Sequence, residues 1–261
     1  MRSFSIIALC ASLVGANPVL MRSDKTVVDN DTFKKMVYYL GFPRFTHYLA
    51  TNTTCAPGNG GELIEYINVT STDTQAALWK STSTKEIVLG IPGTSGDRDV
   101  FTDLEIALVS YKSPNVDCTD DCKVHDGFQK AWNSIEPAVS ASLAKALKAN
   151  PGYTTIVSGH SLGAAIAALA FASLVNGPYN VTTAYTYGQP RTGNQAFANY
   201  LDSISGASDT EPGILYRVTH SNVEHGASKN PDKTGQVMQR EDTAPVAELQ
   251  RLSFTMWSGH S

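Results

Sequence analysis

A serine between two glycines constrains this chain more than any other feature. Ser161 is at the centre of a G-x-S-x-G motif that runs from Gly159 to Gly163. The preceding residues, Tyr153–Ser158, are rich in Thr, Ile and Val, as in a buried strand, and Leu162–Leu174 is rich in Ala and Leu and free of helix breakers. A strand, a sharp turn and a helix are the context of a nucleophile elbow, in which a strained turn holds the serine clear of the sheet. The motif therefore predicts a serine nucleophile, and the alternative is a purely structural Gly-Ser turn.

Length and charge restrict the other possibilities. A chain of 261 residues with 42% hydrophobic content can bury one sizeable core, so we expect one catalytic domain. The net charge of -4 is mild, and no cluster of Lys and Arg gives the electrostatic footprint of a nucleic-acid-binding protein. No regular spacing of metal-ligating residues is evident, so neither a metal nor an organic cofactor is predicted. We expect a monomer that does not bind nucleic acid.

The N-terminus has the pattern of a secretory signal peptide. Arg2 precedes the apolar run Phe4–Val14, and small residues follow, so residues 1–16 are predicted to be removed after Ala16. This run is too short for a membrane span, and no later stretch reaches the roughly 20 apolar residues that a transmembrane anchor needs. We therefore predict a secreted, extracellular protein. Glycosylation in a eukaryotic secretory route is predicted at four sequons, which begin at Asn30, Asn52, Asn68 and Asn180.

The cysteines predict one disulfide. Cleavage would remove Cys10 and leave three cysteines, an odd number in an oxidising compartment. Cys118 and Cys122 enclose only three residues, a span that a local loop disulfide can close, which leaves Cys55 without a partner.

Strands and helices alternate along the chain, as in an α/β fold with a mixed sheet. The expected helices, besides the one after Ser161, cover 31–40, 128–148 and 194–201, and the expected strands cover 62–69, 76–81, 85–91, 181–187 and 214–219.

Four blocks of sequence occur in the order of a known family. They are Gly93-Thr94, Lys123–Phe128, the elbow Gly159–Gly163, and Tyr187–Asn194 with the later Tyr216–His220. Through these blocks, residues 30–222 resemble the fungal class 3 lipase family, which includes filamentous-fungal triacylglycerol lipases and feruloyl esterases. The resemblance implies an α/β-hydrolase fold over residues 17–222, with a central, mostly parallel mixed sheet flanked by helices and a short lid helix.

The resemblance also implies roles in the site. Ser161 is the nucleophile, and the backbone N–H groups of Thr94 and Leu162 form the oxyanion hole, with help from the Thr94 hydroxyl. Free donors at the start of a helix favour the negative charge that develops there. For Thr94 the alternative is a turn residue that bonds locally. His160 is expected to be structural, because its side chain leaves the turn in a different direction from Ser161.

The segment Ser95–Leu104 resembles the lid helix of the family. Val100, Phe101 and Leu104 could form an apolar face that opens onto a lipid–water interface, while the charged residues keep the other face in water. The alternative is an ordinary surface helix that covers the core.

The resemblance ends after Asn222. In the family, the next residues include the catalytic aspartate, a Val-Pro and Leu-Pro-Pro block, and a distant Tyr-x-His motif that supplies the base, and this chain has none of them. Residues 223–261 are predicted to form an atypical, irregular or disordered tail. A retained intron or a shifted reading frame would explain both the tail and the unpaired Cys55, since the family ties an early cysteine to one near the C-terminus. Genuine divergence is the alternative.

Two residues of the tail satisfy the family order of serine, acid and histidine. Glu224 is the candidate acid and His260 the candidate base, with Asp232, Asp242 and His225 as weaker candidates. The sequence thus predicts a secreted carboxylic ester hydrolase that acts through an acyl-enzyme on Ser161. A triacylglycerol lipase is favoured over a feruloyl or aryl esterase by the apolar face of the expected lid. A hypothesis of another class is a catalytically impaired product that keeps the scaffold and lacks its acid and base.

Overall fold

A mixed sheet forms the centre of the fold in the computed structural model, which describes residues 28–53, 59–93, 107–118, 121–208 and 212–219. Within these residues the main sheet has six strands in the order β1-β2-β3-β6-β7-β8. They are β1 (Glu62–Val69), β2 (Thr74–Ser81), β3 (Glu86–Ile91), β6 (Thr154–His160), β7 (Val181–Tyr187) and β8 (Leu215–Val218). The first two pairings are antiparallel and the remaining three are parallel. The strand that ends at the nucleophile motif therefore lies inside the sheet.

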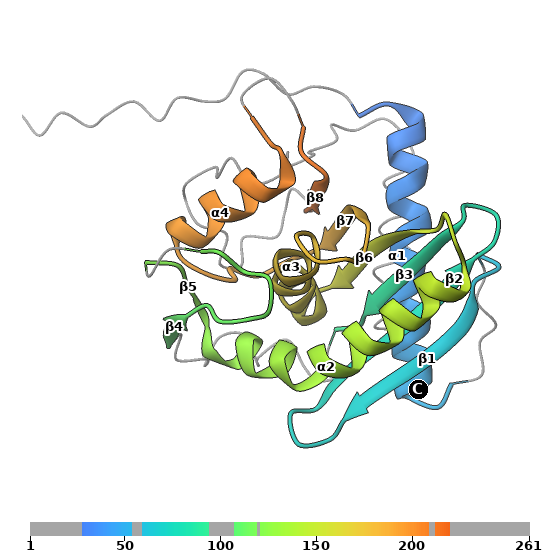
Figure 1. The fold of residues 1–261 in the computed structure, drawn as a ribbon, viewed down its shortest axis with the longest axis horizontal. Helices are drawn as coiled ribbons and strands as arrows, with labels where there is room; N and C mark the ends of the chain where they lie inside the picture. The colour runs from blue at the N-terminus through green and yellow to red at the C-terminus, as the bar shows by residue number, and fades with distance from the viewer. Residues whose placement is uncertain (1–27, 54–58, 94–106, 119–120, 209–211, 220–261) are drawn as a thin grey trace, which may run out of the picture.

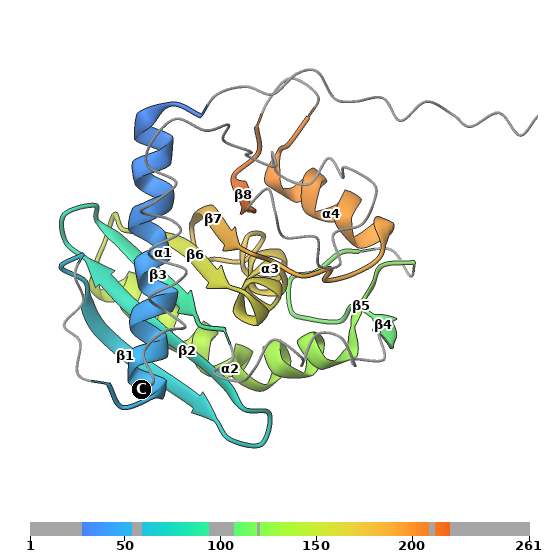
Figure 2. The ribbon, with the colours of Figure 1, turned by 180° about the vertical axis from the view of Figure 1, so that it is seen from behind.

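Helices cover both faces of this sheet (Figures 1 and 2). Helix α1 (Asn30–Ala50) packs on one face, and α2 (Asp126–Ala149) and α3 (Leu162–Leu174) pack on the other. The core on the side of α2 and α3 is mainly aliphatic, with aromatic rings at Tyr111, Phe128, Trp132, Phe171 and Phe197, whereas the core on the side of α1 is mainly aromatic. Because β6 is covered on both faces, its residues are nearly all buried, as expected of a central parallel strand.

Helix α1 is longer than the predicted helix of 31–40, and Pro43 lies inside it. A proline has no N–H for the carbonyl four residues earlier, which here belongs to Tyr39. The hydroxyl of Ser158 on β6 donates to that carbonyl at 2.8 Å, so the freed acceptor is satisfied by the sheet. Burial of Phe42 and Phe45, on either side of Pro43, stabilises this helix further, and helix propensities along the sequence do not include such burial. The prediction that the helix ends at residue 40 was wrong because tertiary contacts offset the cost of Gly41 and Pro43.

The other predicted helices and strands that fall within the described residues are confirmed with small shifts of their ends. Helix α4 (Gln195–Ser205) continues four residues beyond the predicted end, to a left-handed cap at Gly206. A short hairpin, β4 (Leu108–Ser110) with β5 (Lys123–His125), was not predicted. Strands of three residues carry no periodicity, so only the pairing in space reveals them.

Candidate active site

Ser161 lies at the junction of β6 and α3 in the strained geometry of a nucleophile elbow. Its backbone has φ 54 and ψ -122, and residues with a Cβ rarely adopt a positive φ. Ser161 is the N-cap residue of α3, yet its side chain makes no capping hydrogen bond. Its backbone N–H donates instead to the carbonyl of Tyr187 on β7 at 2.8 Å, which fixes the turn against the sheet. The hydroxyl is thus left available for chemistry.

Two glycines allow this elbow to pack. A Cβ on Gly159 would lie 2.3 Å from the carbonyl oxygen of Gly163, and a Cβ on Gly163 would lie 2.1 Å from the carbonyl oxygen of Pro92. Neither distance is compatible with a side chain, so strand and helix approach as closely as their backbones permit. Both glycines of the motif are therefore required because any side chain at these positions would clash with the backbone.

The turn after β3 adjoins the nucleophile. A Cβ on Gly93 would lie 3.1 Å from the Cβ of Ser161 and 3.2 Å from the carbonyl oxygen of His160. Thr94, the predicted oxyanion residue, follows directly but lies outside the described residues, as does the predicted lid at 95–104. The described part of the chain therefore brings the turn that leads to Thr94 against Ser161.

Leu162 presents the second predicted oxyanion donor. As the first residue of α3, it has a backbone N–H without an acceptor inside the helix. The first turn of α3 carries no acidic residue that would offset the positive end of the helix dipole. An N–H in this position can stabilise a negative oxygen bound to the carbon that Ser161 attacks.

His160 is half-buried beside the nucleophile, and its imidazole remains neutral at ordinary pH. Burial lowers the pKa of its imidazole to about 4, and the proximity of His47 on α1 contributes further in the same direction. Its Nδ1 atom is buried and has no hydrogen-bond partner among the described residues. A Cβ on Gly159 would point toward α3. Because successive residues of a strand point to opposite faces, the side chain of His160 lies on the α1 side of the sheet. This direction agrees with the prediction that His160 is not the base.

Acid should destabilise the protein through His160. The folded state binds the proton only near pH 4, whereas an exposed histidine binds it near 6.5, so stability is lost as pH falls from 6.5 to about 4 and stays level below. This pKa difference corresponds to roughly 3 kcal/mol. Urea unfolding at pH 7 and pH 4 should show a drop that is smaller by about this amount in His160→Asn than in the wild type. An equal drop in both proteins would show that His160 is not the group that titrates.

His125 is a structural residue at the start of α2. It is 6% exposed and is the N-cap of α2, where its Nδ1 accepts a hydrogen bond from the N–H of Gly127 at 3.1 Å. Burial lowers the pKa of His125 and Asp126 opposes this effect, so the neutral form that can accept is favoured. This capping histidine was not predicted in detail, because histidine is not a preferred N-cap residue.

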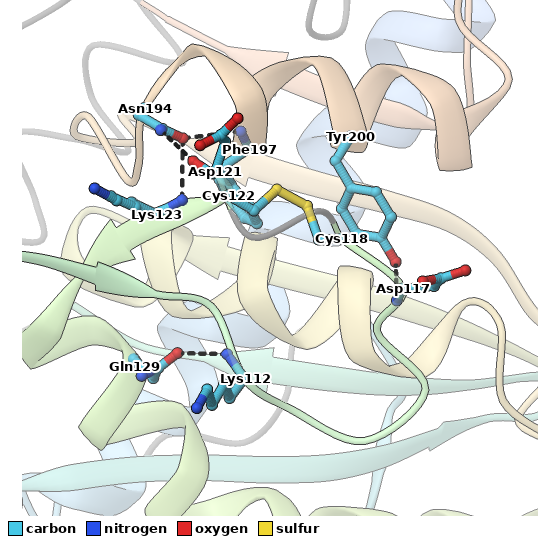
Figure 3. The surroundings of a disulfide bond; sticks show 10 residues. All are labelled: Lys112, Asp117, Cys118, Asp121, Cys122, Lys123, Gln129, Asn194, Phe197 and Tyr200. Carbon is cyan, nitrogen blue, oxygen red and sulfur yellow. Dashed lines mark hydrogen bonds between the residues drawn. A yellow bond between two sulfur atoms is a disulfide. The ribbon is translucent and has the colours of Figure 1, made fainter.

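Cys118 and Cys122 form the predicted disulfide, which lies beside α4 (Figure 3). Asn194, the N-cap of α4, accepts from the backbone N–H groups of Lys123 and Phe197 and donates to the carbonyl of Asp121 at 2.6 Å. The disulfide therefore closes the loop before β5, and the amide side chain of Asn194 ties the end of that loop to the start of α4.

Several predicted residues lie outside the described residues. These are the candidate acid Glu224 and base His260, the weaker candidates Asp232, Asp242 and His225, Cys55, and the signal peptide of residues 1–16. The structure thus places Ser161, Leu162 and the Gly93 turn together and leaves the acid and base as predictions. Across the described ranges, no helix has the length and apolarity to cross a membrane, and no three His, Cys, Asp or Glu side chains are grouped as a metal would require.

Comparison with known proteins gives consistent results. A family model described as "Lipase (class 3)" matches residues 88–245. A secreted mono- and diacylglycerol lipase of Fusarium solani is 35% identical over 153 residues, which cover 58% of this chain and 41% of that protein. A secreted mono- and diacylglycerol lipase of Penicillium cyclopium is 28% identical over 232 residues, which cover 84% of this chain and 72% of that protein. The chain thus matches less than half of the Fusarium relative.

A solved structure extends the similarity to the fold. A triacylglycerol lipase, described as having a serine protease triad at its catalytic centre, is 28% identical with a TM-score of 0.64. The match covers 75% of this chain and 73% of that one. The predicted α/β-hydrolase fold, with its mostly parallel mixed sheet and flanking helices, is confirmed.

Proposed function

The chain belongs to the class 3 lipase family, and from this premise we propose that it is a secreted hydrolase of acylglycerol esters that works through an acyl-enzyme on Ser161. The observation that carries the proposal is the backbone of Ser161, with φ 54 at the start of α3 and a side chain free of capping bonds. Strain of this kind is maintained only where surrounding structure holds it, and it is concentrated at functional sites. Positive φ also occurs at turn residues such as Lys85 and Asn115, but Ser161 combines it with ψ -122, which lies outside the left-handed helical region.

The residues at the elbow suggest the following steps. A general base takes the proton of the Ser161 hydroxyl as its Oγ attacks the ester carbonyl carbon, and the carbonyl oxygen becomes a tetrahedral oxyanion. The N–H of Leu162, together with that of Thr94, stabilises this oxyanion. The intermediate collapses as the C–O bond to the alcohol breaks and the base returns its proton to the leaving oxygen. Water then attacks the acyl-enzyme by the same route, which releases the carboxylic acid and restores Ser161. Glu224 and His260 remain the predicted acid and base.

The substrate class follows from the relatives. Two of them are named for mono- and diacylglycerols and one for triacylglycerols, so acylglycerols are the substrate class that these names share. The sequence favoured triacylglycerol, and secretion is supported by the names of the relatives and by the pattern of residues 1–16. A feruloyl esterase remains the alternative within the family.

One experiment tests both the nucleophile and the substrate. The full chain is incubated with diethyl p-nitrophenyl phosphate, and hydrolysis of emulsified tri-, di- and monoacylglycerols is measured beside methyl ferulate. We expect one diethylphosphoryl group on the peptide that contains Ser161, loss of hydrolysis in proportion to labelling, and a preference for acylglycerols over ferulate. Label on another residue would refute the mechanism, whereas faster hydrolysis of ferulate would assign the chain to the feruloyl esterases. A folded but unlabelled and inactive chain would support the impaired-product hypothesis.

A further inference from the structure

His160 touches the nucleophile turn, yet the steps of ester hydrolysis give it no role. Its Nδ1 lies 3.4 Å from the position that a Cβ on Gly93 would occupy, and its carbonyl oxygen lies 3.2 Å from the same point. That point is also 3.1 Å from the Cβ of Ser161. Gly93 therefore rests in a corner formed by the imidazole of His160, the backbone of His160 and the side chain of Ser161.

Helix α1 covers the face of the sheet on which this imidazole lies. Ser158, two residues earlier on β6, faces α1 and donates to the carbonyl of Tyr39, and alternation along the strand places His160 on the same face. On this face the positive charge of His47, near the end of α1, acts on His160 and lowers the pKa of its imidazole. The ring thus lies between a helix that is anchored to the sheet and the turn that follows β3. It cannot move toward α1 without disturbing a packed layer.

A proton on His160 would have no compensating partner among the described groups that face it. From α1 the facing group is His47, which repels a second positive charge and whose own pKa is lowered by burial. From β7 the register neighbour is Tyr187, and burial raises the pKa of its phenol well above its usual value, so the phenol carries no charge. A charged imidazole here would need water, either by rotating outward or by admitting water beside Gly93.

We propose that neutral His160 is a positioning residue for ester hydrolysis, which holds the Gly93 turn against Ser161, and that its protonation displaces this turn and stops turnover. The inference rests on the proposed function, because it takes Ser161 as the nucleophile. A displacement of about 1 Å in a catalytic constellation can lower the rate by roughly 100-fold, so a small shift of the turn is sufficient.

The structural part can be tested without activity. In the ¹⁵N-labelled full chain, the ring nitrogens of His160 and the backbone amide of Gly93 are followed by NMR as pH is lowered. We expect both signals to titrate with one common midpoint, and the Gly93 signal to become pH-independent in His160→Asn. His47→Gln removes the facing imidazole and should move the common midpoint to higher pH. A Gly93 signal that stays constant while His160 is protonated would overturn the proposal.

The kinetic part separates positioning from simple stability. kcat and KM are measured for wild type and His160→Asn from pH 8 downward, at each pH where tryptophan fluorescence reports a folded protein. We expect kcat of His160→Asn to be lower by roughly tenfold at pH 8 with little change in KM. In acid, log kcat of the wild type should approach a slope of two against pH, one proton each for the base and His160. His160→Asn should keep a slope of one.

Two results would contradict the kinetic part or the function behind it. Equal slopes in both proteins would overturn the role of His160. If the wild type shows no hydrolysis above that of Ser161→Ala, the proposed function fails instead, and the NMR titration still decides whether His160 holds Gly93.

Discussion

Ser161→Ala should lower kcat for ester hydrolysis by at least about 10⁴-fold while the protein stays folded. The hydroxyl makes no capping bond, so its removal costs little stability. The backbone donors that remain can still support roughly 10³-fold acceleration over water, so a weak residual rate is expected. The measurement is kcat on a p-nitrophenyl ester, with the unfolding free energy determined in urea for the same preparation.

Ser158→Ala is the matched control. Ser158 lies on β6, three residues before Ser161, is fully buried, and donates to the Tyr39 carbonyl that Pro43 leaves without its helical partner. Its loss should cost about 1–2 kcal/mol of stability and leave kcat of the folded protein close to that of the wild type. If Ser161→Ala retained most of the activity, the elbow would be structural and another residue would carry the reaction.

Features set by neighbours in sequence could be predicted from this chain. The elbow is one, because a strand, a Gly-rich turn and an Ala-rich helix are local signals, and α3 begins and ends at the predicted residues. The disulfide between Cys118 and Cys122 is another, since a separation of four residues leaves little choice of partner. The oxyanion role of Leu162, which the family resemblance implies, stays a prediction.

Features set by contacts between distant segments could not be predicted. Helix α1 runs through Pro43 because Ser158, far away in sequence, satisfies the carbonyl that proline leaves free. Gly93 follows β3 and lies against His160 and Ser161 at the end of β6, and neither segment alone predicts this contact. The acid and base of a triad are likewise defined by position in space, so Glu224 and His260 could be proposed only from their order along the chain.

Gly163→Ala should be among the most destabilising single substitutions in this protein, although local propensity predicts the opposite. Inside a helix, alanine is favoured over glycine by about 1 kcal/mol. At position 163, however, the added methyl would lie 2.1 Å from the carbonyl oxygen of Pro92 and 2.4 Å from that of Ile91. Both atoms belong to backbone at the end of β3, so no side chain can rotate away and α3 must separate from the sheet. We expect a loss of about 4 kcal/mol or more, a large part of the stability of an ordinary domain.

Gly127→Ala isolates the steric cause. Gly127 also lies at the start of a helix, but a methyl there would meet only the imidazole of His125, at 3.1 Å and 3.2 Å, and a side chain can shift by the few tenths of an ångström required. Its unfolding free energy should stay within about 1 kcal/mol of the wild type. Urea unfolding of both variants, with the yield of folded protein recorded, gives the comparison. If Gly163→Ala were as stable as Gly127→Ala, β3 and α3 would not be in backbone contact, and the strained geometry of Ser161 would lose the packing that maintains it.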